Sequence, residues 1–122
     1  MTPPRLAHTV LLCSDLERSL RFYREVLGLS VAAEVPGWVE LDAGATRLTL
    51  RRRDRPYDGE APRGAGVQIA FLVEAWAVDE WHERLVAAGC EIVERPATTD
   101  YGHRTLFFRD PDGNVVEIYA EV

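Results

Sequence analysis

Four polar residues each interrupt an otherwise apolar stretch of this sequence. They supply an imidazole, a hydroxyl, an amide and a carboxylate, which are groups that donate or accept hydrogen bonds from a ligand. Side chains alternate between the two faces of a β-strand, and the apolar neighbours of these residues suit the face that packs against a helix. We therefore expect all four on the opposite face of their sheets, and we expect function there. The four residues are His8, Thr49, Gln68 and Glu117.

The first half of the chain contains the elements that must position two of these residues. The apolar stretch 8–13 predicts a strand, and Ser14 and Asp15 then provide a helix N-cap. A helix is expected over 15–27, with Gly28 ending it. Strands are expected over 30–35, 38–41 and 47–51. The apolar stripe predicted for the helix consists of Leu16, Leu20, Tyr23 and Leu27.

The second half repeats this order of elements. A strand is predicted over 67–73, a helix over 75–88, and further strands over 91–93, 103–109 and 115–120. Gln68 aligns with His8, and Gly89 aligns with Gly28. We therefore expect one domain, residues 1–122, with one module over 5–53, a linker over 54–65 that is rich in charge, Pro and Gly, and a second module over 66–122. The stripe predicted for the second helix consists of Val78, Trp81, Leu85 and Ala88.

Composition narrows the classes of partner. The 122 residues carry a net charge of −6 at pH 7, so nucleic acid and anionic membrane surfaces are not expected as partners. The sequence has neither an apolar run long enough to cross a bilayer nor an apolar signal segment at its start, and we expect a cytoplasmic protein. Cys13 and Cys90 are too few for a disulfide framework and are expected to be reduced.

Two segments resemble the vicinal oxygen chelate superfamily, which includes glyoxalase I, extradiol dioxygenases, fosfomycin-resistance enzymes and bleomycin-resistance proteins. They are HTVLLCSDLERSLRFYREVLGL over 8–29 and FFRDPDGNVVEI over 107–118. The resemblance covers nearly the whole chain. It implies an α+β fold of two βαβββ modules whose curved mixed sheets form a cup, often in a homodimer, with a divalent metal ion on the concave face.

The same resemblance implies a metal-ligand set. His8 and Glu117 match the superfamily's ligand positions, whereas Gln68 stands where histidine is usual and Thr49 stands where glyoxalase I has a metal-binding glutamate. Imidazole, carboxylate and amide oxygen form an acceptable set for Fe²⁺, Mn²⁺, Zn²⁺ or Ni²⁺. Alternatively, His8 and Glu117 form a hydrogen-bonded pair in a cup that holds no metal.

Other residues are candidates for substrate contact. Trp38 lies on the strand face away from Val39 and Leu41, and Tyr119 shares a face with Glu117. His103 follows a loop that borders the pocket mouth in the superfamily, but alternation alone does not say which face it occupies. The substrate-binding candidates are Trp38, Thr49, His103 and Tyr119, and no residue is assigned a catalytic role.

Two functions are consistent with this pattern. One is a metal-dependent enzyme whose metal chelates neighbouring oxygens of a small substrate. Dioxygenase-like or epoxide-opening chemistry is then favoured over glyoxalase I chemistry, because Thr49 lacks the carboxylate that the isomerisation uses. The other is a metal-free resistance protein that sequesters an aromatic or cationic antibiotic. A homodimer is expected in both cases, because a sheet with one bare face exposes apolar surface and strand edges.

Overall fold

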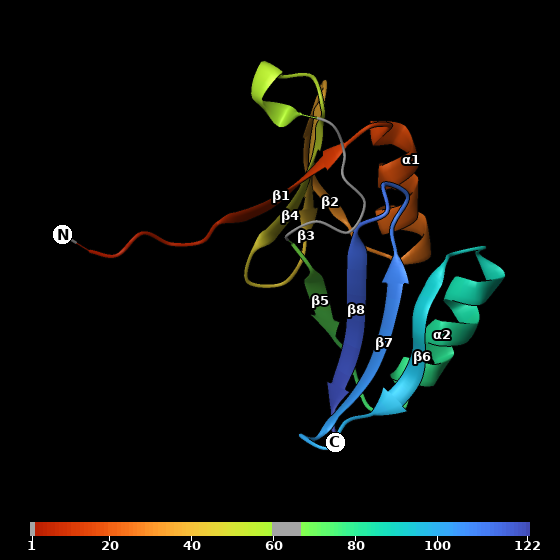
Figure 1. Ribbon diagram of the computed structural model, residues 1–122. Coiled ribbons are helices and arrows are strands. Elements are labelled where there is room, and N and C mark those ends of the chain that lie inside the picture. Colours follow the sequence, from red (N-terminus) through yellow and green to blue (C-terminus); the bar gives the residue numbers. More distant parts are fainter. Residues whose placement is uncertain (1, 60–66) are drawn as a thin grey trace. The chain divides into compact units, whose positions relative to one another are not determined.

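The order strand, helix, strand, strand, strand occurs twice in the computed structural model, which describes residues 2–59 and 67–122 (Figure 1). Each set of elements forms a compact unit, with the boundary between residues 61 and 62. The predicted α+β class and the two βαβββ sets are therefore confirmed. Residues 60–65 of the predicted linker lie outside the described residues, and a short 3-10 turn over Pro56–Asp58 occupies part of the remainder.

The first unit contains a four-stranded mixed sheet. Its first strand pairs in parallel with its last, and the helical segment carries the chain across from the first strand to the opposite edge of the sheet. The other neighbouring pairs are antiparallel. The strands are β1 (His8–Cys13), β2 (Val31–Val35), β3 (Trp38–Asp42) and β4 (Arg47–Arg52), in the spatial order β1-β4-β3-β2.

The crossover helix begins as the sequence predicts and then changes its winding. Helix α1 (Leu16–Arg21) is capped by Asp15, whose carboxylate accepts the backbone N–H of Arg18. A π-helical turn over Phe22–Val26 continues it, and Gly28 follows with φ of +81°.

The predicted apolar stripe of this helix was therefore partly wrong. A π turn takes more residues per turn than an α-helix, so the inward face moves along the sequence. Phe22 is buried beside Tyr23, and their rings meet edge to face with centroids 5.1 Å apart. Leu16, Leu20 and Leu27 are only half-buried.

The second unit repeats the parallel pairing of first and last strands. Strand β6 runs to Thr98 although the sequence predicted only 91–93, because Pro96 and its charged neighbours resemble a loop. An edge strand accepts proline, since one of its sides needs no ladder hydrogen bonds. The elements are β5 (Ile69–Leu72), α2 (Ala77–Ala87), β6 (Ile92–Thr98), β7 (His103–Arg109) and β8 (Val115–Glu121), with strand order β5-β8-β7-β6.

Each sheet buries one row of side chains, as alternation predicts. The buried strand residues are Leu11, Cys13, Val39, Leu41, Leu48 and Leu50 in the first unit and Leu106, Phe108, Val116, Ile118 and Ala120 in the second. Helix α2 contributes Val78 and Leu85 to the core, while Trp81 is half-buried and Ala88 is exposed, so only half of the predicted α2 stripe is buried.

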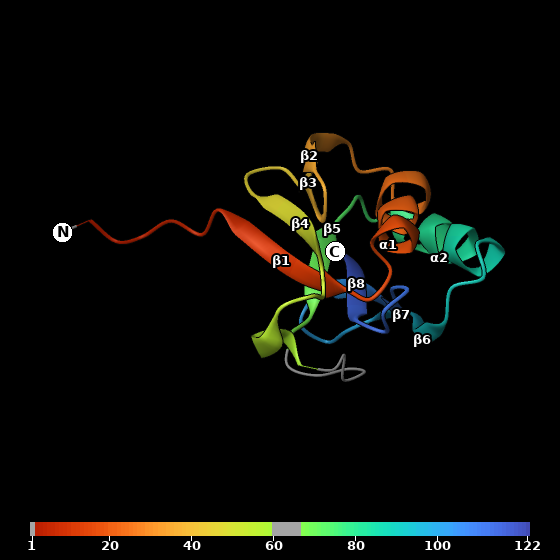
Figure 2. The same cartoon turned by 90° about the horizontal axis from the view of Figure 1, so that it is seen from above.

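Two further features complete the fold. Residues 2–7 are exposed and lead away from β1 in both views (Figures 1 and 2). Among the described residues, no helix has the length and apolar character needed to span a membrane.

Candidate functional site

The open face of the first sheet gathers the side chains that alternation assigned to it. Thr49 on β4 lies opposite Val10 of β1 and Glu40 of β3 in the register of the sheet. His8 reaches across to Thr49, with 2.8 Å between its Nδ1 and the threonine Oγ1. Thr49 is fully buried, so its hydroxyl is committed to this contact rather than to solvent.

Trp38 and Glu40 lie on the same face, two residues apart on β3. The indole Nε1–H of Trp38 donates to Oε2 of Glu40 over 2.9 Å, and the Trp38 ring lies 6.0 Å from the His8 ring. His8 and Glu40 line a common pocket of about 320 Å³, whose rim includes the turn between β3 and β4. The predicted candidates His8, Trp38 and Thr49 are therefore brought together, and Glu40 joins them.

The open face of the second sheet carries the other predicted donors. Glu117 lies on β8, and its Oε1 is 3.5 Å from the side-chain nitrogen of Gln68, at the outer limit of a hydrogen bond. Gln68 is the residue immediately before β5, and it is exposed. Tyr119 shares the Glu117 face, because both alternate with the buried Val116 and Ile118.

The structure also settles which face His103 occupies. Leu106 and Phe108 are fully buried on the helix side of β7, which leaves His103 on the open side. The His103 ring lies 4.9 Å from the Tyr119 ring and 5.2 Å from the exposed ring of Tyr101. His103 and Tyr119 are thus brought together with Glu117 on one face.

The surroundings of Glu117 disfavour the charged form of its carboxyl group. Partial burial raises the pKa of its carboxyl group above the ordinary 4.5, although the charge of His103 and the contact with Gln68 oppose the shift. A carboxylate in such a place is stabilised by a cation bound next to it.

Each unit presents donor groups that suit a divalent ion. A neutral His8 that donates its Nδ1–H to Thr49 keeps Nε2 as a lone-pair donor, which is the arrangement found for metal-binding histidines. Glu117 and Gln68 offer oxygen ligands in the second unit. Within residues 2–59 and 67–122, no group of three His, Cys, Asp or Glu side chains is close enough to hold a metal ion.

Glu40 is not among the candidate site residues predicted from the sequence. Its spacing of two residues from Trp38 on a strand was the available signal, since residues at that spacing share a face.

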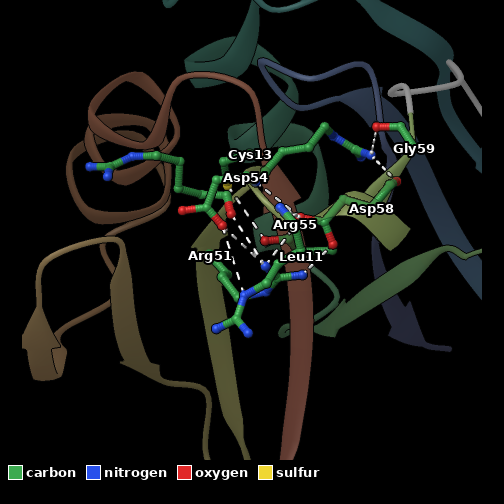
Figure 3. Close-up of polar contacts among 9 residues, drawn as sticks. Leu11, Cys13, Arg51, Asp54, Arg55, Asp58 and Gly59 are labelled. Atoms are coloured by element: carbon green, nitrogen blue, oxygen red, sulfur yellow. Dashed lines mark hydrogen bonds and ion pairs between the residues drawn. The ribbon is translucent and has the colours of Figure 1, made fainter.

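Several arginines within and just after β4 have partners of their own. Arg51 is ion-paired to Asp58 over 2.6 Å, and Arg53 donates to the backbone oxygens of Asp58 and Gly59 (Figure 3). Arg47 is paired with Asp42 over 2.7 Å. These charges are therefore already engaged in ion pairs and hydrogen bonds at the two ends of β4.

A family model described as the Glyoxalase/Bleomycin resistance protein/Dioxygenase superfamily matches residues 5–118, almost the whole of this fold. The chain belongs to this superfamily. Virulence protein STM3117 of Salmonella typhimurium is 31% identical over 119 residues, which cover 93% of this chain and 82% of that protein. Its crystal structure matches with a TM-score of 0.76 and covers 100% of both chains.

Two further superfamily members are similar to the chain. The crystal structure of a glyoxalase/bleomycin resistance protein/dioxygenase from Nocardioides has a TM-score of 0.84 at 27% identity and covers 100% of this chain and 86% of that one. Metallothiol transferase FosB of Shouchella clausii is 26% identical over 114 residues, which cover 93% of this chain and 77% of that protein. The resemblance predicted from segments 8–29 and 107–118 is thus confirmed at the level of the superfamily.

Proposed function

We propose that this protein is a divalent-metal-dependent enzyme that binds two neighbouring oxygen atoms of a small substrate. His8, Gln68 and Glu117 would hold the metal ion, which is Fe²⁺, Mn²⁺, Zn²⁺ or Ni²⁺ in this proposal. The observation that carries it is the His8–Thr49 contact of 2.8 Å, which occupies one imidazole nitrogen and leaves the other for a ligand. A relative named as a metallothiol transferase adds support at the level of the superfamily.

The bound ion would act as a Lewis acid that stabilises negative charge on the substrate oxygens. The chain's own residues orient the donors and the substrate. Thr49 fixes the ring of His8, and Gln68 contacts the carboxylate of Glu117. Trp38 and Tyr119 present ring surfaces on the two open faces, and His103 adds an imidazole beside Tyr119. We propose Trp38, Thr49, His103 and Tyr119 as the residues that line the substrate site.

The favoured reaction class follows from the side chain at position 49. The hydroxyl of Thr49 is bound to His8 and is not a base that shuttles protons at neutral pH. Oxygenation of a ring that carries neighbouring hydroxyl groups, or opening of an epoxide, requires no carboxylate at this position. We therefore favour these two reactions over the isomerisation catalysed by glyoxalase I.

The test is metal binding by the purified protein. Metal content is measured after purification without chelator, and Mn²⁺, Fe²⁺, Ni²⁺ and Zn²⁺ are titrated calorimetrically into the stripped protein. We expect one bound ion per set of His8, Gln68 and Glu117, and a loss of affinity in Glu117→Gln and His8→Ala. Unchanged affinity in both variants would reject this ligand set.

The alternative function, sequestration of an antibiotic without a metal, predicts a different result. A parent protein that binds none of the four ions, but whose tryptophan fluorescence responds to an aromatic cationic antibiotic, would be a metal-free sequestering protein. We also propose a homodimer located in the cytoplasm, and sedimentation equilibrium tests the first of these two properties.

A further inference from the structure

The pocket beside His8 contains a carboxylate that the proposed ligand set does not use. Glu40 lies on β3 directly opposite Thr49, and the side chains of directly opposed strand residues have Cβ atoms about 4.5–5.5 Å apart. His8 contacts the same threonine from the other side, since β1 and β3 flank β4. Glu40 and His8 therefore flank Thr49 and line one pocket of about 320 Å³.

One oxygen of the Glu40 carboxylate is fixed in place. Trp38 donates its Nε1–H to Oε2 over 2.9 Å, and both side chains are half-buried on the open face of the sheet. Carboxylates that bind metal ions are themselves held by such hydrogen bonds, which set their orientation and leave the second oxygen for the ion. This arrangement would also order a tryptophan ring beside the imidazole of His8.

The charge around the pocket is compatible with a cation. Arg47 and Asp42 line its rim and are paired with one another over 2.7 Å, so their charges offset each other. Arg5 is a further cation at the rim, and it is exposed to solvent. Glu40 is the carboxylate that lies opposite Thr49 and lines this pocket together with His8.

We propose that Glu40 is an additional carboxylate donor to the divalent ion that binds at His8. This inference rests on the proposed function and extends it, because it adds an oxygen donor from the first unit to the nitrogen of His8.

The experiment measures Mn²⁺ affinity and tryptophan fluorescence together. The Glu40→Gln variant keeps an oxygen that accepts the Trp38 N–H but removes the negative charge. Asp42→Asn is the matched control, because Asp42 lines the same pocket and carries the same charge but is bound to Arg47. We expect Glu40→Gln to weaken Mn²⁺ binding by about ten-fold or more and Asp42→Asn to change it by less than about three-fold.

The fluorescence of Trp38 should show whether the ion binds close to it. Mn²⁺ is paramagnetic and should quench the indole next to its site in the parent protein, and Trp38→Phe should remove most of this quenching while calorimetry shows the ion still bound. Trp38→Phe also removes the N–H that orients Glu40, so we expect a smaller loss of Mn²⁺ affinity there than in Glu40→Gln. Glu40→Asp that binds Mn²⁺ no better than Glu40→Gln would overturn the donor role. Circular dichroism confirms that each variant is folded, and Glu40→Asp, which keeps the charge, should recover part of the affinity.

The outcomes separate this inference from the proposed function. Parent-like Mn²⁺ affinity in Glu40→Gln, with affinity lost in Glu117→Gln, would overturn the role of Glu40 and leave the proposed function standing. A parent protein that binds no divalent ion would reject both.

Discussion

Arg51 and Asp58 form a two-point ion pair across a turn of the chain. The two guanidinium nitrogens of Arg51 donate to the two carboxylate oxygens of Asp58 over 2.6 and 3.2 Å (Figure 3). The Asp58 carboxylate also accepts the backbone N–H groups of Asp54 and Arg55. The Asp58 side chain thereby holds residues 54–58 against the end of β4.

This ion pair predicts a pH dependence of stability. The hydrogen bond from Arg51 lowers the pKa of Asp58 from 3.8 to about 2. A carboxyl group with a lowered pKa stabilises the folded state above its unfolded pKa, and this contribution is lost as the pH falls from 3.8 towards 2. We expect Asp58→Asn to lower the melting temperature at pH 7 and to show a shallower decline than the parent over that acid range. Asp54→Asn, in an exposed position, should behave like the parent, and equal curves for all three proteins would contradict the assignment.

A second ion pair joins helix α2 to strand β7. Arg104 donates to both carboxylate oxygens of Asp79 over 2.8 Å, and this contact lowers the pKa of the Asp79 carboxyl. Both side chains are partly exposed, so we expect Asp79→Asn to cost about 0.2–1 kcal/mol in the free energy of unfolding. Urea titration measures this cost, and it should shrink in about 1 M NaCl because salt screens exposed charges. A difference that grows with salt would show that another interaction is responsible.

Gly28 is a place where backbone conformation limits the choice of residue. Its φ is +81°, and a Cβ added there would meet nothing within 4 Å. The cost of Gly28→Ala is therefore conformational, and we expect a loss of about 1–2 kcal/mol in thermal unfolding. Gly28→Asn should lose less, since asparagine tolerates the left-handed region better. Equal losses in the two variants would indicate a steric cause instead.

The core of the first unit should be sensitive to truncation. Leu50 on β4 is fully buried, whereas Val35 on β2 is 58% exposed. We expect Leu50→Ala to cost about 2–5 kcal/mol by urea unfolding. Val35→Ala is the control and should change the stability by less than about 0.5 kcal/mol.

Glu117 should destabilise the metal-free protein at neutral pH. Because burial raises the pKa of its carboxyl, the folded state favours the protonated form, and the group stabilises the fold most at acid pH. We expect metal-free Glu117→Gln to melt above the parent at pH 7 and to lose this advantage as the pH falls towards 4.5, the ordinary pKa of the group, because the folded parent then becomes protonated. A variant that melts below the parent at pH 7 would show that the carboxylate is structural.

Much of the fold could be predicted from local pattern. Strand β7 has the predicted bounds, 103–109, because its apolar residues alternate and turn residues flank it. Strand β6 was predicted too short, because the edge position that permits Pro96 is a property of the sheet rather than of the segment. The π turn after Arg21 escaped prediction for a similar reason, since a helical period of 3.6 residues assumes uniform winding.

The site was predictable only in part. Alternation placed His8 with Thr49 on one open face and Glu117 with Tyr119 on another, because a strand has only two faces. It could not assign His103 to a face until the burial of Leu106 and Phe108 was known. The bond between Trp38 and Glu40 depends on side-chain rotamers, which a strand pattern does not specify.

The parallel pairing of first and last strands sets when each sheet can close during synthesis on the ribosome. Strand β1 has its partner as soon as β4 is made, so the first sheet can close while the rest of the chain is still being translated. Strand β5 is likewise an edge strand, and its neighbour in the sheet is β8, where Ile69 pairs with Val116. A nascent chain interrupted before residue 115 would hold β5 unpaired, with an open strand edge and Leu72 61% exposed even in the finished fold. Synthesis of β8 is therefore the step that pairs the edge of β5 and protects the second unit from misassociation.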